Sequence, residues 1–215
     1  SLVIGISGGI DSSVSSTLSA MTGLKTIVLT MPIKQKKDQH DLSLKHQDWL
    51  IKNYKNVEAH TINLDRLFES FSSTLNTFEN EHGFANSRAR LRMTTLYQVA
   101  AANKGIVVGT GNKVEDFGVG FYTKYGDGGV DISPIADCNK TEVWELGKEL
   151  GILKEIIDAP PTDGLWDDGR TDEGQLGFKY KDLEDAMKNP NSPHRQEYEK
   201  IRKQNLHKME PIPVC

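Results

Sequence analysis

The sequence predicts an α/β fold in which helices cover both faces of a doubly wound parallel sheet. Short apolar runs of the kind that form buried parallel strands alternate with longer segments of helical character. Polar, glycine-rich turns directly follow two of these runs, and ligands of such folds bind at the carboxyl ends of the strands. The 215 residues contain no internal repeat, and we expect one domain spanning residues 1–215.

The elements are expected to follow one another in the order that right-handed parallel crossovers require. Apolar runs predict strands at Leu2–Ile6, Thr26–Met31, Val57–Leu64 and Ile106–Gly109. Helices are predicted at Ser12–Met21, Asp41–Lys52, Leu64–Phe78, Asn86–Asn103, Lys140–Leu150, Tyr180–Met187 and Arg195–Asn205. Because the first strand begins at the second residue, we expect that further residues precede Ser1 in the natural protein.

The composition argues against several classes of protein. A net charge of −4 disfavours a general nucleic-acid binder, and no apolar run approaches the ~18 residues of a membrane span. No signal peptide is recognisable. Cys138 and Cys215 are too few for a disulfide framework, and the histidines show no zinc-ligand spacing. A reducing, cytoplasmic location is therefore expected, with no membrane and no nucleic-acid partner.

The segment from Ser7 to Ser12 reads Ser-Gly-Gly-Ile-Asp-Ser and joins the first strand to the first helix. A strand, a glycine turn and a helix start together aim backbone N–H groups at phosphate. Gly8 and Gly9 let an anion approach the backbone closely. Asp11 would repel phosphate unless a divalent cation joined them, so the loop indicates a nucleotide with Mg²⁺. A plain strand–helix turn is the alternative.

This loop resembles the SGGxDS loop of the N-type ATP pyrophosphatases. Members of that superfamily cleave ATP between the α and β phosphates and adenylate a carbonyl or carboxyl oxygen. They then pass the activated product to a nitrogen or sulfur nucleophile. The resemblance implies their adenine nucleotide alpha hydrolase-like, Rossmann-like fold.

A second polar segment, Gly109–Glu115, directly follows the predicted fourth strand. Thr110 stands at the strand end, where it can hydrogen-bond a base or a sugar. Glu115 is far enough along the chain to turn back over the phosphates, where it and Asp11 would complete an oxygen-rich Mg²⁺ site. Taken alone, Glu115 would be an exposed surface acid.

A third segment, Phe121–Asp131, combines three glycines and several aromatics with Lys124, Asp127 and Asp131. This composition makes a poor helix and a poor strand, so the segment is either a flexible loop or a shaped binding loop. Aromatic rings beside a cation and two acids suit a ring-bearing ligand with a carboxylate. We therefore favour a binding loop.

Together and in this order, the three segments resemble the NAD synthetase family. Further matches over essentially the whole chain are Pro134, Asn139-Lys140, Pro161-Thr162, Asp172-Glu173, Leu176-Gly177 and His207-Lys208 before Pro211. The resemblance implies ATP-dependent amidation of deamido-NAD (nicotinic acid adenine dinucleotide) with ammonia. The products would be NAD, AMP and pyrophosphate, formed through an acyl-adenylate in the final step of NAD biosynthesis. It also implies a homodimer and Mg²⁺ as the cofactor.

The resemblance assigns a role to each matching residue. ATP would be bound by Gly5, Ile6, Ser7, Gly8, Gly9, Ile10, Asp11, Ser12, Thr110, Lys140 and Thr162. Deamido-NAD would be bound by Arg90, Lys124, Asp131, His207 and Lys208. Mg²⁺ would be held by Asp11 and Glu115. Asp127 stands where the family has a carboxylate near the incoming ammonia, and it is the candidate catalytic proton acceptor.

Helix geometry supports Arg90 independently of the resemblance. An apolar stripe repeats at helical spacing along Met93–Ala100, and Arg90 falls on its edge at about 100° per residue. Arg88 and Arg92 are expected to face solvent or to pair at the surface. The resemblance also implies that deamido-NAD lies near the subunit boundary of a homodimer. Additional apolar positions on this helix support the homodimer because they favour burial on several sides. A monomer in which this helix is central in the fold is the alternative.

Three segments depart from the family pattern or from ordinary composition. Thr30–Gln35 lacks the arginine, aromatic and glycine usual there, so no adenosine contact is assigned to it. One extra residue lies near Phe117–Gly120, where glycine is expected to absorb it. Ala159–Gly174, rich in Pro, Gly and Asp, is predicted to be a mobile loop, either a lid over the nucleotide or an ordinary surface loop.

Two other functions stay open on the sequence alone. The chain could be another adenylating synthetase or amidase with the same loop, or a non-catalytic nucleotide-binding module. Such a module needs neither metal carboxylates nor a second ligand loop. Pyrophosphate release from ATP that depends on deamido-NAD would separate the three functions.

Overall fold

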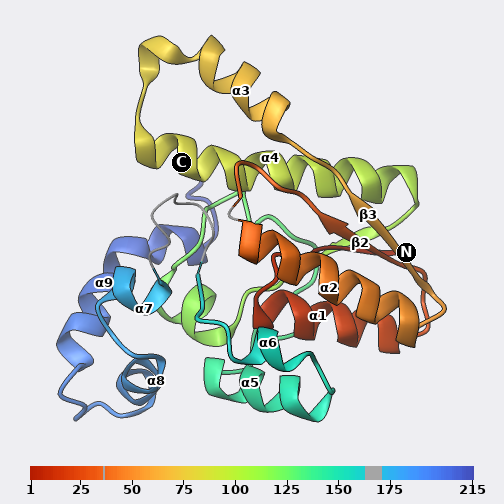
Figure 1. Cartoon of the computed structure of the whole chain (residues 1–215). Coiled ribbons are helices and arrows are strands. Elements are labelled where there is room, and N and C mark those ends of the chain that lie inside the picture. The colour runs from red at the N-terminus through yellow and green to blue at the C-terminus, as the bar shows by residue number, and fades with distance from the viewer. Residues whose placement is uncertain (36, 163–170) are drawn as a thin grey trace.

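The computed structural model describes residues 1–35, 37–162 and 171–215. Its sheet has four parallel strands in the order β3-β2-β1-β4 (Figure 1). The strands are β1 (Leu2–Gly5), β2 (Thr26–Thr30), β3 (Val57–Thr61) and β4 (Ile106–Val108). Helices cover both faces of this sheet, which confirms the predicted fold class. No helix in the described part of the chain is long and apolar enough to cross a membrane.

The described helices alternate with the strands as predicted and continue beyond them. They are α1 (Ile10–Met21), α2 (Lys37–Asn53), α3 (Asp65–Thr74), α4 (Glu81–Ala102), α5 (Lys140–Glu149), α6 (Lys154–Ile157), α7 (Asp172–Leu176), α8 (Tyr180–Lys188) and α9 (Arg195–Met209). Two other helical turns are the 3₁₀ turn η1 (Asn76–Phe78) and the π-helix η2 (Lys113–Val119). Figure 1 shows α3 above α4, while α7, α8 and α9 gather beside the sheet.

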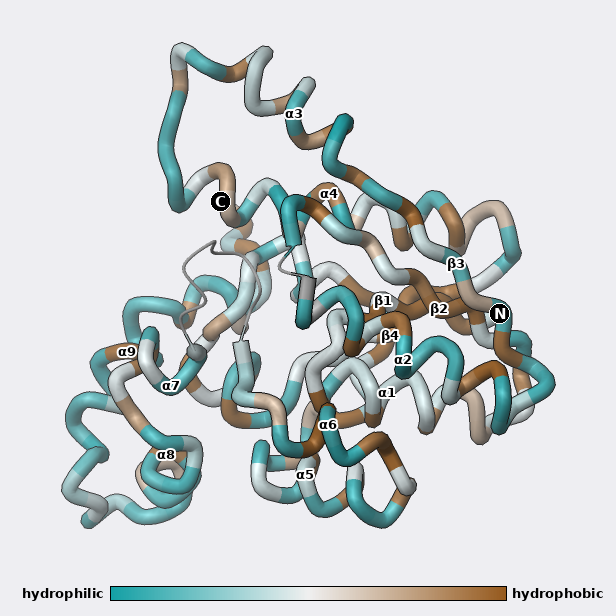
Figure 2. Tube along the Cα trace, in the orientation of Figure 1, coloured by the Kyte–Doolittle hydropathy of each residue, from teal (hydrophilic) through white to brown (hydrophobic). Residues whose placement is uncertain are grey.

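The core has one layer on each face of the sheet because successive strand side chains point in opposite directions. Val3, Ile27 and Val107 lie on one face, with Phe68 of α3 and Ala100 of α4. The opposite face carries their strand neighbours, packed against α1 and α2; these are Leu2, Ile4, Val28 and Val108. Figure 2 shows the brown, hydrophobic stretch of chain running along β1, β2 and β4.

The strand order places the ligand-binding end of the sheet. The chain moves from β1 outward to β2 and β3, and then returns to pair β4 with the other side of β1. This reversal is a topological switch point, and the loops after β1 and β4 diverge there. Both motif loops, at Ser7 and at Thr110, therefore start from the same edge of the sheet.

The structure differs locally from the sequence predictions at β3, at α4 and after β4. β3 ends at Thr61, although Ile62 still donates its N–H to the Thr30 carbonyl (2.9 Å) beyond the regular ladder. Helix α4 begins five residues early because the Asn80 side chain accepts a hydrogen bond from the Gly83 amide at 2.7 Å. The third difference is the π-helix η2, which the sequence analysis did not anticipate.

The predicted lid, Ala159–Gly174, is only partly described. Residues 163–170 lie outside the described residues, so the lid prediction stays untested. The last part of the segment is not a loop, because α7 begins at Asp172 with Thr171 as its cap. The Thr171 hydroxyl accepts a hydrogen bond from the Gly174 amide at 3.1 Å, a typical N-cap contact.

Candidate active site

A cavity of about 250 Å³ lies at the carboxyl ends of β1, β2 and β4. It is lined by Ser7, two residues beyond β1, by Thr30, the last residue of β2, and by Gly109, which directly follows β4. A second cavity of about 90 Å³ lies along the phosphate loop, and Ser7, Asp11 and Thr162 line both. The concave surface therefore lies at the switch point of the sheet.

Every residue predicted to bind ATP lines one or both cavities. The larger cavity is lined by Gly5, Ile6, Ser7, Asp11, Ser12, Thr110 and Thr162. The smaller one is lined by Ser7, Gly8, Gly9, Ile10, Asp11, Lys140 and Thr162. Met31 and Gln35 also line the larger cavity, so the segment to which no adenosine contact was assigned faces it.

The serines of the phosphate loop hydrogen-bond to one another and to the loop backbone. The hydroxyls of Ser7 and Ser12 lie 3.0 Å apart, and Ser12 also donates to the Gly9 carbonyl at 3.1 Å. Gly8 has a φ of 92°, which a side chain would strain. Helix α1 begins at Ile10, so its N-terminal amides face the loop and suit an anion there.

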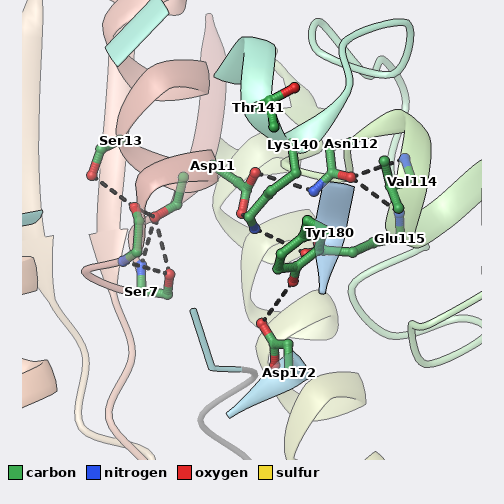
Figure 3. A network of polar contacts seen from close by, with 12 residues as sticks. Ser7, Asp11, Ser13, Asn112, Val114, Glu115, Lys140, Thr141, Asp172 and Tyr180 are labelled. Carbon is green, nitrogen blue, oxygen red and sulfur yellow. Dashed lines mark hydrogen bonds and ion pairs between the residues drawn. The ribbon is translucent and has the colours of Figure 1, made fainter. Parts of the chain in front are cut away.

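Two carboxylates and one ammonium form the centre of the site, and they come from three elements (Figure 3). Lys140, at the start of α5, lies 2.5 Å from Asp11 Oδ2 of α1 and 2.9 Å from Glu115 Oε1 of η2. The Lys140 side chain is only 1% exposed, so the interaction is shielded from water. We call Asp11, Glu115 and Lys140 the carboxylate cluster.

Asn112 and Tyr180 hold the carboxylate cluster from either side (Figure 3). Asn112 Nδ2 donates to Asp11 Oδ1 at 3.2 Å, and Asn112 Oδ1 accepts from the Glu115 amide at 3.0 Å. The Tyr180 hydroxyl donates to Glu115 Oε1 at 2.5 Å, and its oxygen lies 3.4 Å from Asp172 Oδ2. The cluster is therefore fixed by neutral donors as well as by charge.

Burial and charge shift the ionisation of the cluster. Burial raises the pKa of the Asp11 carboxyl, and the Lys140 ammonium opposes that rise. Burial would lower the pKa of Lys140, but the Asp11 and Glu115 carboxylates outweigh it and raise that pKa. Burial and the Glu115 charge raise the pKa of Tyr180, so its hydroxyl stays protonated as a donor.

Asp127 and Asp116 bring two more carboxylates to the larger cavity. Asp127 Oδ1 accepts a hydrogen bond from the Thr123 amide at 3.0 Å. Burial and the charges of Asp127 and Glu115 raise the pKa of Asp116 well above its ordinary value. The predicted catalytic residue is therefore placed on the cavity wall, with a second acid that the sequence analysis did not single out.

The residues predicted to bind deamido-NAD line neither cavity, but four of them meet in one place. Arg90 of α4 donates to the Lys124 carbonyl at 3.3 Å, and Lys124 Nζ donates to the His207 carbonyl. Lys208 Nζ donates to the carbonyls of Gly120 and Tyr122, at 2.7 and 2.8 Å. We call Arg90, Lys124, His207 and Lys208 the basic cluster.

Asp131 lies apart from the basic cluster. Its carboxylate accepts from the Tyr97 hydroxyl at 3.0 Å and from the Val107 amide at 2.7 Å. These bonds tie the end of the predicted binding loop to α4 and β4. The contacts that the structure describes for Asp131 therefore stabilise the fold.

The prediction that Arg88 and Arg92 face solvent or pair at the surface is wrong. Arg92 lines the larger cavity and donates to the Met31 carbonyl at 2.9 Å and to Gln35 Oε1 at 2.8 Å. The Arg88 guanidinium lies over the Phe68 ring, 5.0 Å from its centroid. Helix α4 is covered on this side by α3 and by the chain after β2, which a single helical stripe could not reveal.

Two residues of the carboxylate cluster could hold a divalent cation. Asp11 and Glu115 supply hard oxygen donors, and their contact with one ammonium shows that a cation fits between them. Within residues 1–35, 37–162 and 171–215, no three His, Cys, Asp or Glu side chains are grouped to hold a metal. Phosphate oxygens would have to complete the ligand set.

The structure also adds residues that sequence reasoning missed. Asn112 lies in the Gly109–Glu115 segment but was assigned no role there, although an Asn just before a helix is a recognisable cap. Tyr180 and Asp116 carried no local signal. Tyr180 is 65 positions from Glu115, so only the fold brings them together.

Known proteins resemble this chain in sequence. The family model described as NAD synthase matches residues 1–212. The NH(3)-dependent NAD(+) synthetase of Carboxydothermus hydrogenoformans is 41% identical over 189 residues, 85% of this chain and 74% of that protein. The enzyme of the same name from Finegoldia magna is 38% identical over 212 residues, covering 96% of this chain and 83% of its own length.

Solved structures give the same fold. NMN synthetase from Francisella tularensis has a TM-score of 0.91 and 34% identity, covering 100% of this chain and 88% of that one. NH3-dependent NAD synthetase from Campylobacter jejuni has a TM-score of 0.79 over 100% of this chain and 89% of its own, but its 24% identity supports the fold alone. From the family model and the curated relatives together, we conclude that this chain belongs to the NAD synthase family.

Proposed function

We propose that this chain catalyses the ATP-dependent amidation of deamido-NAD by ammonia, giving NAD, AMP and pyrophosphate. The observation that carries the proposal is the carboxylate cluster beside the phosphate loop, in a chain of the NAD synthase family. Curated relatives at about 40% identity are named as NH(3)-dependent NAD(+) synthetases.

The first half-reaction activates a carboxylate. An oxygen of the nicotinate carboxylate attacks the α-phosphorus of ATP, the bond to the β-phosphate oxygen breaks, and pyrophosphate leaves. The Ser7–Ser12 loop and the N-terminus of α1 bind the phosphates, and Lys140 balances their charge. Asp11 and Glu115 would hold Mg²⁺, which supplies charge neutralisation when it is bound.

The second half-reaction forms the amide. Ammonia attacks the acyl carbon of the adenylate, AMP leaves, and one proton is released. Ammonium is the dominant form at neutral pH, so a proton acceptor near the carbonyl helps. Asp127 on the cavity wall is the proposed acceptor. Free ammonia is the proposed nitrogen donor, because the curated relatives are named NH(3)-dependent NAD(+) synthetases.

The proposal includes the assembly and the remaining contacts. We place deamido-NAD against the basic cluster, at the boundary between two copies of this chain. Exposed apolar side chains at the α3–α4 projection suit a second copy: Leu67 is 49% exposed and Phe78 is 78% exposed. A cytoplasmic location fits the two free thiols, Cys138 and Cys215.

A second acceptor substrate is favoured by one observation. The solved structure with a TM-score of 0.91 is named as an NMN synthetase, which indicates an amidated mononucleotide as product. The activating chemistry would be the same, because the nicotinate carboxylate is common to both acceptors. The two candidates differ only in whether the adenosine half of the dinucleotide is bound.

One assay tests both acceptors. Pyrophosphate release from ATP is measured with ammonium chloride and either deamido-NAD or nicotinic acid mononucleotide. We expect release that depends on deamido-NAD, with NAD formed in equal amount. A higher kcat/KM with the mononucleotide would transfer the proposal to NMN synthesis, and no release with either acceptor would refute it.

A further inference from the structure

We propose that Asn112 and Tyr180 are positioning residues that orient the Asp11 and Glu115 carboxylates toward a divalent cation. The inference rests on the proposed function, because it assigns the cation to the carboxylate cluster. Neither residue is placed on substrate or phosphate. Each would act through the carboxylate it contacts.

Asn112 fixes both carboxylates at once. Its side chain is buried, and Nδ2 donates to Asp11 Oδ1 at 3.2 Å. Its Oδ1 accepts from the Val114 and Glu115 amides, both at 3.0 Å, and so caps the π-helix that carries Glu115. One side chain therefore sets the distance between α1 and η2 at their carboxylates.

Tyr180 fixes the rotation of Glu115. Its hydroxyl and Lys140 Nζ both donate to Glu115 Oε1, at 2.5 and 2.9 Å. No described residue donates a hydrogen bond to Glu115 Oε2. Because both donors use the same oxygen, the other carboxylate oxygen is presented to a further ligand.

The environment of Tyr180 makes its geometry rigid. The ring is 1% exposed and packs edge-on against Trp144, with centroids 5.8 Å apart. Glu173 Oε1 also accepts a hydrogen bond from the Tyr180 amide at 3.0 Å. Groups that hold a ligating carboxylate in this way typically change metal affinity about 10- to 100-fold when they are removed.

The test compares two buried tyrosines of the same hydrophobic cluster. Tyr180→Phe removes only the hydroxyl that reaches Glu115, and Tyr198→Phe is the matched control because its ring is also buried there. Mn²⁺ binding is measured by electron paramagnetic resonance in the presence of α,β-methylene-ATP, which cannot react. The Mg²⁺ concentration for half-maximal amidation and the KM for deamido-NAD are measured in parallel.

We expect Tyr180→Phe to weaken Mn²⁺ binding and to raise the half-maximal Mg²⁺ concentration by about tenfold. The KM for deamido-NAD should stay within about twofold, and saturating Mg²⁺ should restore much of kcat. Tyr198→Phe should leave the metal dependence unchanged. A Tyr180→Phe protein with wild-type Mn²⁺ affinity, or equal losses in both variants, would overturn the role of Tyr180.

Asn112→Ser provides a second, independent variant. Serine still caps a helix but is too short to reach Asp11 Oδ1. We expect the melting temperature to change little and the half-maximal Mg²⁺ concentration to rise. An unchanged metal dependence would overturn the role of Asn112. If the wild-type protein forms neither NAD nor NMN, the proposed function is refuted. The Mn²⁺ measurement does not depend on that activity, so it still tests the positioning roles of Asn112 and Tyr180.

Discussion

The carboxylate cluster and the basic cluster hold their charges in different ways. Lys140 is 1% exposed and contacts two carboxylates, so its charge is neutralised within the protein. In the basic cluster, by contrast, the ammonium of Lys208 and the guanidinium of Arg90 donate to backbone carbonyls, and Arg90 and His207 are exposed. The first cluster is complete in one chain, whereas the second keeps net positive charge facing outward.

Because of this difference, we expect the two clusters to have different roles. Buried, mutually paired charges are preorganised and need little rearrangement when ATP binds. Exposed cations on loop carbonyls can exchange those contacts for the phosphates of a substrate at low cost. Substitutions in the carboxylate cluster should therefore abolish catalysis, whereas substitutions in the basic cluster should weaken substrate binding.

The largest effect is expected for Asp11→Asn. The change removes one of the two charged oxygens beside Lys140 while an amide still fits the first turn of α1. Pyrophosphate release should fall by more than about 100-fold, with little change in melting temperature. Asp137→Asn, on an exposed residue near α5, is the control. Near-normal activity with normal Mg²⁺ dependence would contradict the comparison.

The stability of the fold around α1, the helix that carries Asp11, should also depend on pH. His46 of α2 is buried and contacts Ser16 of α1 at 3.0 Å, and burial lowers its pKa to about 4 from 6.5. The unfolded chain therefore takes up the proton first as the pH falls. Stability present above pH ~6.5 should be lost progressively toward pH ~4, by up to about 3 kcal/mol.

Urea unfolding between pH 7 and pH 4 measures this loss. His46→Gln cannot take up the proton, so its free energy of unfolding should fall less steeply over that range. His60→Gln, on an exposed residue of β3, should keep the wild-type slope. Equal slopes for His46→Gln and wild type would show that this buried imidazole is not the source.

Arg90→Ala tests the other side of the comparison. Loss of an exposed guanidinium that meets a phosphate should raise the KM for deamido-NAD by about tenfold and leave the KM for ATP nearly unchanged. Arg66→Ala, an exposed arginine on α3, should change neither constant. A tenfold rise in the KM for ATP would mean that the two clusters are not separate in function.

The smallest effect is expected for Lys208→Met. The variant keeps the length of the side chain but loses the hydrogen bonds to Gly120 and Tyr122. The KM for deamido-NAD should rise by about threefold, and amide hydrogen exchange should quicken in residues 120–124. A rise larger than that of Arg90→Ala would indicate that Lys208 binds substrate directly.

The sequence predicted those features that depend on residues close together in the chain. Strands, the phosphate loop and the position of Thr110 follow from apolar runs and glycine turns, and the structure has them within a few residues. The ion pair of Lys140 with Asp11 joins residues 129 positions apart, so no spacing rule could reveal it. The family resemblance named both residues but gave no contact between them. The prediction for Arg92 was wrong because helix periodicity describes one face of the helix and says nothing of the elements that cover the other faces.

The π-helix η2 lies between Thr110 and the Phe121 loop, where the sequence analysis expects one extra residue. It widens one helical segment and ends at Gly120, whose φ is 69°. Glu115 lies near its start, and the loop with Lys124 and Asp127 lies beyond its end. A one-residue insertion or deletion in η2 beyond Glu115 would move that loop relative to Asp11 and Glu115. The length of η2 therefore sets how far Lys124 and Asp127 stand from Glu115 along the chain's path.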